Sequence, residues 1–355
     1  MKIALVSPRY WPYRGGVERY VDEIASRLIR QMEVEVLTTD PHGGLAAYEL
    51  IHGVPVRRFR SWAPNDNIYG SIDLFRYLWR HSNQYHIVHA NSYHALPAYY
   101  AAESKRRNKY VFTPHFHGAK GHSNLANFLH ASYRFLGKKI FDRADRVIYS
   151  SLFERKKILE AFQVPDFKLV RIVEGITAIP LGSRFESEGM KTILCVCRLE
   201  KYKGVQYVLR ALPRLPSFKM IVVGSGPYAG HLHHLAQSLS LEGRVEFRDN
   251  VTEEALARIY AQTDVAVLLS EHEAYSLFIG EALSSGIPCV VANRDALSEW
   301  VDGKTCVGLD DPTDSDAVAE IILRATGRRI SRHLPTWDDY VVRLIDVYNL
   351  CLSAQ

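Results

Sequence analysis

The most informative stretch of the sequence is Val265-Ala-Val-Leu-Leu-Ser-Glu-His-Glu273-Ala-Tyr-Ser-Leu-Phe-Ile-Gly-Glu281. Its first five residues are apolar and predict a buried strand, and the segment from Glu273 to Ser285 predicts a helix. A strand, a short loop and a helix in this order offer backbone N–H groups to a bound phosphate. The two glutamates would lie about 12 Å apart in a fully helical segment, which suits two parts of one extended ligand. The alternative is a pair of surface acids at an ordinary helix start, where acids are favoured.

Strand-like and helix-like segments alternate along the whole chain, without an internal repeat or a low-complexity segment. In the first half, the predicted strands cover residues 2–7, 33–38, 54–59, 86–90, 109–113 and 146–150. In the second half, they cover residues 192–197, 218–223, 244–248, 265–269 and 288–292. This alternation predicts an α/β fold with two parallel, doubly wound sheets.

Two domains are expected, because 355 residues exceed what one hydrophobic core usually holds. The predicted N-terminal domain covers residues 1–175, and the predicted C-terminal domain covers residues 185–337. Gly, Pro and Ser become frequent at residues 174–190, which favours a linker there. The segment from Trp337 to Leu352 predicts a last helix.

The composition, with 47% hydrophobic and 23% charged residues, is typical of a soluble globular protein. No run of about 18 apolar residues predicts a transmembrane helix, and the N-terminal residues lack the three regions of a signal peptide. Five cysteines, of which Cys195 and Cys197 are expected on opposite faces of one strand, indicate no disulfide framework. A reduced, cytoplasmic protein is therefore expected.

Charge is divided unevenly: residues 1–180 carry a net charge of +10 and residues 181–355 carry −5. The cations concentrate at residues 57–60, 105–107 and 134–157. The last of these stretches mixes cations with apolar residues, and anionic lipid attracts such a surface by about 1 kcal/mol per cation. The alternative is a solvated helix face whose apolar side packs into the core. No nucleic-acid partner is expected, because no reading motif accompanies the cations.

Two glycine motifs follow predicted strands. The motif Gly224-Ser-Gly226-Pro-Tyr-Ala229 fits the alanine-ending dinucleotide-binding fingerprint, and Asp249 lies 25 positions after Gly224, where a ribose-binding acid is expected. This pattern leaves an NAD-type oxidoreductase open. The motif Gly15-Gly16 precedes a helix with apolar residues at a 3.6-residue period, and it lets the backbone approach an anion.

Histidines follow another predicted strand, in Val111-Phe-Thr-Pro-His115-Phe-His117-Gly118. A lone histidine is usually a hydrogen-bonded structural residue, whereas two histidines separated by one residue can indicate a metal. No metal is expected here, because the 15 histidines are not accompanied by a matching acid or Cys cluster. A further group, His231, His233 and His234, predicts an exposed helix face.

In series, these motifs resemble the retaining GT-B glycosyltransferases of the family-4 type over nearly the whole chain. The motifs that carry the resemblance are the Glu pair around Tyr275-Ser-Leu277, Arg198 with Lys203, Gly-Ser-Gly-Pro, Gly15-Gly16 and Thr113-x-His115. The resemblance implies two Rossmann-like domains facing across a cleft, with residues 338–355 crossing back onto the first domain. The N-terminal domain would bind the acceptor, and the C-terminal domain would bind a nucleotide-sugar.

The resemblance also implies roles for single residues. Arg198 and Lys203 would bind the donor diphosphate, since fixed cations stabilise the charge that this group gains as it leaves. Glu273 would contact the donor sugar and Glu281 the ribose, while His115 would orient the sugar from the opposite wall. Further contacts to the donor are implied for Gly15, Gly16, Gly224, Gly226, Val251, Tyr275, Ser276 and Leu277.

The implied reaction moves a sugar, with retention, from a UDP- or GDP-sugar to a hydroxyl of a glycan or lipid-linked acceptor. The leaving phosphate oxygen would act as the base, which agrees with a sequence that shows no nucleophile–base dyad. The nucleotide-sugar is a co-substrate, and no cofactor is expected. No metal is required, because cations and a helix N-terminus neutralise the diphosphate.

Other classes remain as alternatives. A GT-B epimerase or phosphorylase and an inert sugar-nucleotide binder share the architecture, whereas an NAD-type oxidoreductase would leave Arg198, Lys203 and the Glu pair unexplained. The chain departs from the family at one place, where Val173-Glu174-Gly175 stands instead of the usual Pro-Asn-Gly turn. This departure affects the expected local geometry of the hinge between the two domains, but not the expected fold.

Overall fold

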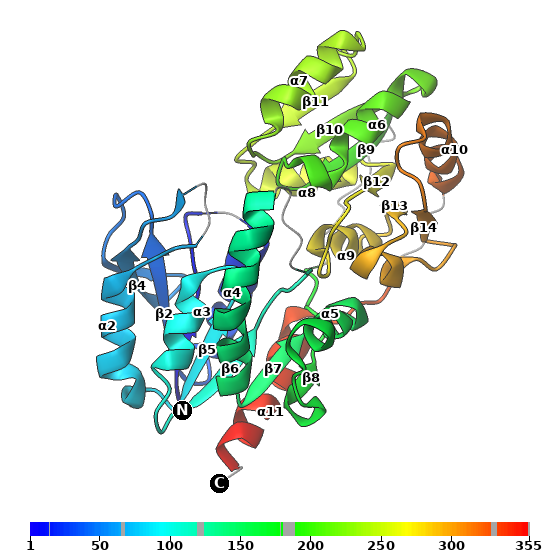
Figure 1. Ribbon diagram of the computed structural model, residues 1–355. Coiled ribbons are helices and arrows are strands. Elements are labelled where there is room, and N and C mark those ends of the chain that lie inside the picture. Colours follow the sequence, from blue (N-terminus) through cyan, green and yellow to red (C-terminus); the bar gives the residue numbers. More distant parts are fainter. Residues whose placement is uncertain are drawn as a thin grey trace. The chain divides into compact units, whose positions relative to one another are not determined.

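The computed structural model describes residues 1–13, 15–64, 68–118, 124–177, 179, 189–327 and 332–353, without the side chains of residues 124–132. The chain divides into two compact units, one of Met1–Gly175 with Trp337–Gln355 and one of Ile176–Thr336 (Figure 1). Each unit is built around a sheet of its own. No helix in the described ranges is long and apolar enough to cross a membrane.

The first unit holds an eight-stranded sheet in the order β3-β4-β2-β1-β5-β6-β7-β8. Its strands are β1 (Lys2–Val6), β2 (Glu33–Asp40), β3 (Tyr48–Ile51), β4 (Val54–Arg60), β5 (Ile87–Asn91), β6 (Lys109–Thr113), β7 (Arg146–Tyr149) and β8 (Leu169–Arg171). Neighbouring strands are parallel except for the edge pair β3 and β4, which is antiparallel. Because β1 lies between β2 and β5, the strand order reverses there, and ligands of open α/β sheets bind at such a switch point.

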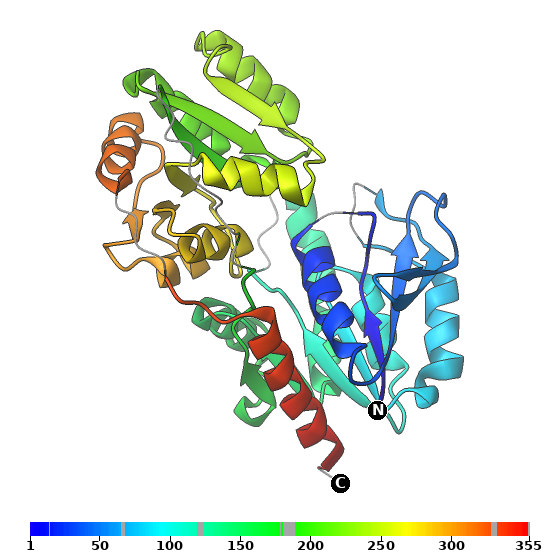
Figure 2. The ribbon, with the colours of Figure 1, turned by 180° about the vertical axis from the view of Figure 1, so that it is seen from behind.

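Helices cover both faces of this sheet. On one face lie α2 (Ile72–His81), α3 (Leu96–Glu103), α4 (Asn124–Arg143) and α5 (Leu152–Phe162), which share an apolar cluster with the strands. On the other face, α1 (Gly16–Leu28) and α11 (Trp337–Ser353) lie side by side (Figure 2). The amphipathic pattern of α1 accounts for its position, because Tyr20, Val21, Ile24, Ala25 and Leu28 are all buried.

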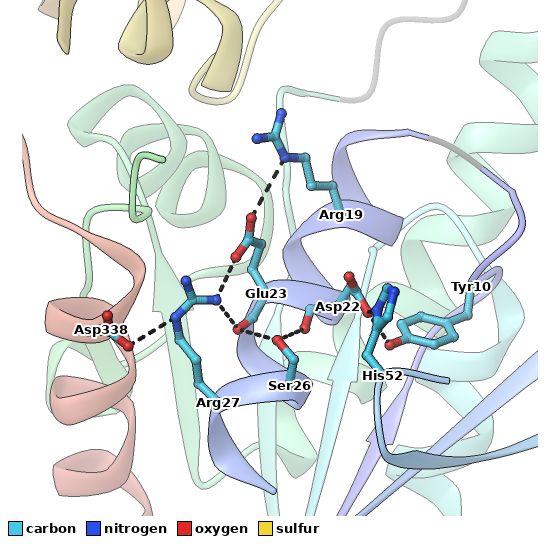
Figure 3. A network of polar contacts seen from close by, with 8 residues as sticks. All are labelled: Tyr10, Arg19, Asp22, Glu23, Ser26, Arg27, His52 and Asp338. Carbon is cyan, nitrogen blue, oxygen red and sulfur yellow. Dashed lines mark hydrogen bonds and ion pairs between the residues drawn. The ribbon is translucent and has the colours of Figure 1, made fainter. Parts of the chain in front are cut away.

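The last helix, α11, is held to the first unit by polar contacts as well as by packing. The hydroxyls of Tyr20 and Tyr340 share a hydrogen bond, and the Tyr348 hydroxyl lies 2.7 Å from His89 Nδ1. Burial lowers the pKa of His89 to about 3, so this ring is neutral. At the surface, Arg27 Nε donates to Asp338 Oδ1 at 3.0 Å within the polar network on α1 (Figure 3).

The second unit holds a six-stranded parallel sheet in the order β11-β10-β9-β12-β13-β14. Its strands are β9 (Lys191–Val196), β10 (Phe218–Val223), β11 (Val245–Arg248), β12 (Val265–Leu268), β13 (Cys289–Ala292) and β14 (Cys306–Leu309). One face packs on α6 (Val205–Ala211), α7 (Ala229–Ser238) and α10 (Ser315–Ala325). Two further helices are α8 (Glu253–Ala261) and α9 (Leu277–Ser284). The switch point of this sheet lies between β9 and β12.

Short 3-10 turns complete the described chain at η2 (Ser82–Gln84), η3 (Asp166–Lys168), η4 (Lys201–Lys203), η5 (Leu212–Arg214) and η6 (Asp295–Trp300). The predicted α/β fold with two doubly wound, mainly parallel sheets is confirmed. The sequence did not predict β3, β8 or β14, which lie at sheet edges and are only partly buried, so they lack a continuous buried apolar run. The antiparallel pairing of β3 also makes the first sheet mixed rather than purely parallel.

Two local expectations are wrong. The helix predicted from Glu273 begins only at Leu277, so the segment between the two glutamates is not fully helical. Cys195 and Cys197 contact the same apolar cluster rather than opposite faces of a strand, because side chains two positions apart on a strand point the same way. All five cysteines are free thiols, which agrees with the predicted absence of a disulfide framework.

Candidate functional site

The predicted site residues of the second unit lie at the carboxyl end of its sheet. Arg198 and Lys203 follow β9, Gly224 and Gly226 follow β10, Val251 follows β11, Glu273, Tyr275 and Ser276 follow β12, and Leu277 and Glu281 belong to α9. The loops after β9 and β12 flank the switch point, which is where open α/β sheets bind nucleotides.

The loop after β9 reaches the end of β12 because residue 204 is a glycine. Gly204 has a φ of +77°, and a Cβ atom there would lie 2.1 Å from the carbonyl oxygen of Leu269. A residue with a side chain would therefore push the two loops apart. The backbone N–H of Glu271 also donates to the carbonyl oxygen of Tyr202 at 2.7 Å. This close approach sets Lys203 beside Glu273.

Lys203 and Glu273 form a largely buried ion pair. Lys203 Nζ lies 2.6 Å from Glu273 Oε1, and the hydroxyl of Ser270 donates to the same oxygen at 3.0 Å. Burial alone would lower the pKa of Lys203, but the Glu273 carboxylate outweighs burial and raises this pKa above its ordinary value. The structure therefore holds a fixed, charged ammonium next to a fixed carboxylate. Neither residue was predicted to pair with the other.

Arg198 lies in the same loop but is more exposed. Its Nε is 3.4 Å from Glu200 Oε1, and 45% of its side chain is accessible to solvent. A solvent-exposed ion pair of this kind contributes little to stability. The Arg198 guanidinium can therefore exchange Glu200 for a phosphate group at low cost.

The fold itself explains why glycines follow β10, without reference to a ligand. Gly224 and Gly226 have φ values of +142° and +157°, and Cβ atoms on them would lie 2.0 Å from the Cys197 carbonyl oxygen and 2.4 Å from that of Leu199. The loop after β10 thus packs backbone to backbone against the loop that carries Arg198. These glycines shape the loop before any donor binds.

The start of α9 is fixed by specific contacts. Ser276 is the N-cap residue, with its hydroxyl accepting from Ile279 N at 3.4 Å, and its φ of +106° is rare for a residue with a side chain. The carbonyl oxygen of Tyr275 accepts from Trp300 Nε1 at 3.1 Å. Within α9, Glu281 is buried and its Oε2 accepts from the Tyr260 hydroxyl at 2.8 Å.

Three supporting residues of this site were missed by the sequence reasoning. Ser270 lies in the loop after β12, three positions before Glu273, and a hydroxyl so close to the predicted glutamate was a signal that the sequence offered. Tyr260 and Trp300 come from other elements, and no local pattern relates them to Glu281 or Tyr275.

The first unit holds the remaining predicted residues. Gly15 is the N-cap of α1, and α1 begins at Gly16, near the carboxyl end of β1 and the switch point of the first sheet. A Cβ atom on Gly15 would lie 2.3 Å from an oxygen of Glu18. Glu18 is buried and pairs with Arg9 Nε at 2.7 Å, so Gly15 makes room for this ion pair.

His115 lies in the loop after β6, with a φ of +49°. Its Nδ1 is 3.5 Å from Glu174 Oε1, and its ring meets the Tyr20 ring edge to face, with centroids 4.7 Å apart. Its Nε2 is buried and has no hydrogen-bond partner among the described residues. The contact with Glu174 was not predicted, because residues 115 and 174 are brought together only by the tertiary fold.

A second buried carboxylate supports the same loop. Glu154 accepts hydrogen bonds from the backbone N–H groups of Phe116, at 2.7 Å, and of Ser150, at 2.8 Å. Burial raises the pKa of the Glu154 carboxyl to about 7, against the opposing effects of His115 and these N–H groups. Among the described residues, no group of three or more His, Cys, Asp or Glu side chains could hold a metal ion. His231, His233 and His234 are exposed on α7, as predicted.

The basic stretch at residues 134–157 is in part buried and in part exposed, and its contact with a membrane stays a prediction. Its apolar residues Ile140, Phe141, Val147 and Ile148 are buried in the core. Several of its cations pair with neighbouring acids, namely Lys138 with Asp142, Lys139 with Glu103, Arg155 with Asp166, and Lys156 and Lys157 with Glu160. Exposed apolar and basic side chains meet on α4, where Phe135 is 66% exposed and Lys139 Nζ lies 5.2 Å from its ring centroid. They also meet on α2, where Trp79 is 49% exposed and the Arg106 guanidinium lies 4.6 Å from its ring centroid.

Family models match both halves of the chain. Residues 14–178 match the Glycosyltransferase Family 4 model, and residues 183–333 match the model of glycosyl transferases group 1. The residues at the two switch points described above lie inside these matches.

Similar proteins cover the chain from end to end. The chain is 26% identical over 404 residues to an uncharacterized glycosyltransferase of Methanocaldococcus jannaschii, with 99% of both chains covered. It is 24% identical to the D-inositol 3-phosphate glycosyltransferase of Mycolicibacterium smegmatis, over 96% of this chain and 87% of the relative. A GDP-mannose-dependent alpha-(1-6)-phosphatidylinositol monomannoside mannosyltransferase of the same organism is 27% identical over 52% of this chain and 54% of its own length.

Solved structures share the fold. A sucrose-phosphate synthase of Thermosynechococcus elongatus superposes with a TM-score of 0.84 at 20% identity, and the match covers 100% of both chains. The Anabaena protein HepE, solved in complex with UDP and glucose, gives a TM-score of 0.79 at 20% identity, again with 100% of both chains covered. With both family models matched and this fold shared, the chain belongs to the GT-B glycosyltransferases of the family-4 type, whose second half is a glycosyl transferases group 1 domain.

Proposed function

We propose that this glycosyltransferase moves a hexosyl group, with retention of configuration, from a UDP- or GDP-sugar to a hydroxyl acceptor. The observation that carries the proposal is the Lys203–Glu273 pair, 2.6 Å apart, at the switch point of the second sheet. A cation that suits a diphosphate and a carboxylate that suits sugar hydroxyls stand together there, next to the loop that carries Arg198.

The proposed chemistry breaks the bond between the sugar C1 and the β-phosphate oxygen, which keeps the electron pair. Arg198 and Lys203 stabilise the negative charge that develops on the leaving diphosphate. The acceptor hydroxyl attacks C1 on the face from which the diphosphate departs, and its proton passes to the leaving phosphate oxygen. Glu273 accepts hydrogen bonds from sugar hydroxyls. No metal ion is needed, because two protein cations provide the neutralisation.

The rest of the donor is held by neighbouring groups. Glu281 accepts hydrogen bonds from the ribose, and the backbone N–H groups at the start of α9 face the phosphates. Val251 lies near the base, and Gly224, Gly226, Gly15 and Gly16 allow close backbone approach. His115 meets the donor sugar through its Nε2, whose buried and unpartnered state among the described residues supports a ligand contact.

Relatives support the donor and acceptor classes. One is named as GDP-mannose-dependent, and a structure of the same fold holds UDP and glucose, so we infer a UDP- or GDP-linked donor. Two relatives are named for inositol phosphate or phosphatidylinositol acceptors. A glycan or lipid-linked hydroxyl is therefore the proposed acceptor. We propose a cytoplasmic protein that reaches such an acceptor by binding peripherally to an anionic membrane surface.

The test follows donor turnover by NMR in the presence of EDTA, with UDP- and GDP-sugars and a panel of polyol and glycolipid acceptors. We expect release of the nucleoside diphosphate and a product whose new bond has the anomeric configuration of the donor. Glu273→Ala is expected to lower kcat by about 100-fold or more, as for loss of a group that acts in the transition state.

Each competing class gives a different product. An inverted product would contradict retention, and an epimerised nucleotide-sugar without diphosphate release would identify an epimerase. A sugar 1-phosphate would identify a phosphorylase. Wild-type turnover by Glu273→Ala would remove the residue from the proposed site.

A further inference from the structure

Glu174 belongs to the segment Val173-Glu174-Gly175, where the resemblance implies a Pro-Asn-Gly turn, and the structure places this glutamate against His115. The Glu174 side chain is buried at the end of the first unit, and its Oε1 lies 3.5 Å from His115 Nδ1. The hydroxyl of Ser150 donates to the same oxygen at 3.0 Å. The unusual carboxylate is thus held in place and directed at one particular nitrogen of the ring.

The His115 loop is fixed on its other sides as well. The backbone at His115 adopts a left-handed conformation, and the next residue, Phe116, donates its N–H to the buried Glu154. The Tyr20 ring packs edge to face against the imidazole. With the ring fixed in this way, only the position of its hydrogen decides what the buried Nε2 can bind.

The chemistry of residue 174 matters because a neutral imidazole has one N–H and one lone pair. An amide, as in the asparagine of the usual turn, can present either an oxygen or an NH2 group to Nδ1, and it therefore does not select a tautomer. An ionised carboxylate only accepts hydrogen bonds. Glu174 therefore selects the ring form that carries its hydrogen on Nδ1.

We propose that Glu174 is a positioning residue that holds the hydrogen of His115 on Nδ1 and leaves the Nε2 lone pair to accept a hydrogen bond from a donor-sugar hydroxyl. The identity of the ligand rests on the proposed function, whereas the contact between the two residues does not. The separation of 3.5 Å is longer than an optimal hydrogen bond, and such contacts tighten when the substrate binds.

The direct test uses protein labelled with 15N-histidine, at a pH where the ring is neutral and without any ligand. Long-range 1H–15N spectra report which ring nitrogen carries the hydrogen, and the spectrum of His115→Gln assigns the signal. We expect the Nδ1–H form in the wild type and in the control Glu160→Gln, which changes an exposed glutamate of the same unit. In Glu174→Ala we expect the Nε2–H form that free histidine prefers. An Nε2–H form in the wild type, or the same form in Glu174→Ala, would overturn the proposal.

The second readout is kinetic. Glu174→Ala is expected to lower kcat for donor turnover by about 10- to 100-fold, as for a misplaced reacting group, and Glu174→Gln is expected to recover part of the loss. Affinity for the free nucleoside diphosphate should stay the same, because Arg198 and Lys203 belong to the second unit. An unchanged kcat in Glu174→Ala would overturn the positioning role.

The two proposals can fail separately. If the wild type turns over no nucleotide-sugar, the proposed function fails, while the tautomer spectra still decide the role of Glu174. If Glu174→Ala loses nucleoside diphosphate binding through misfolding, Glu174→Gln, which keeps the side-chain length, is expected to show a mixture of both tautomers and a kcat below that of the wild type. A pure Nδ1–H form with wild-type kcat in Glu174→Gln would overturn the proposal.

Discussion

At the residue scale, the main finding is that Lys203 and Glu273 neutralise each other before any ligand arrives. The resemblance implied a phosphate role for the lysine and a sugar role for the glutamate, and both roles stay predictions. It could not predict their pairing, which depends on Gly204 allowing one loop to touch the other. The roles of Tyr260 and Glu174 also depend on tertiary contacts for which the chain shows no local pattern.

Because of this pairing, we predict that a substitution in the site raises the affinity for a nucleoside diphosphate instead of lowering it. In Glu273→Gln, a nucleoside diphosphate is expected to bind about tenfold more tightly, by about 1.4 kcal/mol, because its charge no longer competes with a carboxylate for Lys203. Turnover of the nucleotide-sugar is expected to fall, since a neutral amide oxygen accepts weaker hydrogen bonds from the sugar hydroxyls than a carboxylate does. Calorimetry with UDP and GDP measures the first effect.

Glu271→Gln, in the same loop, is the matched control and should bind like the wild type. Unchanged or weaker binding by Glu273→Gln would show that Glu273 does not oppose the diphosphate.

At the scale of elements, the alternation of strands and helices was predictable because most strands are buried and apolar. The edge strands β3, β8 and β14 were not predictable in this way. The start of α9 was misplaced because the residues before it are engaged elsewhere, Glu273 with Lys203 and Tyr275 with Trp300. Contacts outside the helix therefore set the start of α9, which helix propensity alone could not predict.

Helix α2 is the element that best fits the expected membrane contact. It exposes Ile72 and Trp79, and Arg76 and Arg80 lie beside them, with Arg106 over the Trp79 ring. Tryptophan and arginine side chains together suit the interface of an anionic bilayer. Arg76 pairs with Asp73, and several basic residues of α4 and α5 are likewise paired with acids.

We therefore predict salt-sensitive binding to vesicles that contain anionic phosphatidylserine. The double variant Arg80→Glu/Arg106→Glu should bind more than about tenfold more weakly, because each cation near the surface contributes about 1 kcal/mol. The control Lys138→Glu/Lys156→Glu reverses the same charge on α4 and α5 and should have a smaller effect. Equal binding to neutral vesicles, or equal loss in both variants, would contradict a contact through α2.

At the scale of the whole molecule, each unit holds a doubly wound sheet with one switch point, and the two family models place the chain among the glycosyltransferases. The doubly wound architecture was predictable from the sequence. The attachment of α11 to the first unit was implied only by resemblance, because the Tyr20–Tyr340 and His89–Tyr348 contacts join residues 320 and 259 positions apart. The candidate residues of the second sheet came from motifs that the resemblance supplied, and the structure places these motifs after β9, β10, β11 and β12.

The central claim is that this switch point binds a nucleoside diphosphate-sugar through Arg198 and Lys203. Calorimetry tests it most directly, with UDP-, GDP- and ADP-sugars beside NAD and NADP, in EDTA, for the wild type and Arg198→Ala. We expect the wild type to bind one nucleoside diphosphate series without metal, and Arg198→Ala to weaken this binding by about tenfold or more, as for loss of a charge-assisted hydrogen bond. Binding of NAD or NADP alone, or wild-type affinity in Arg198→Ala, would contradict it.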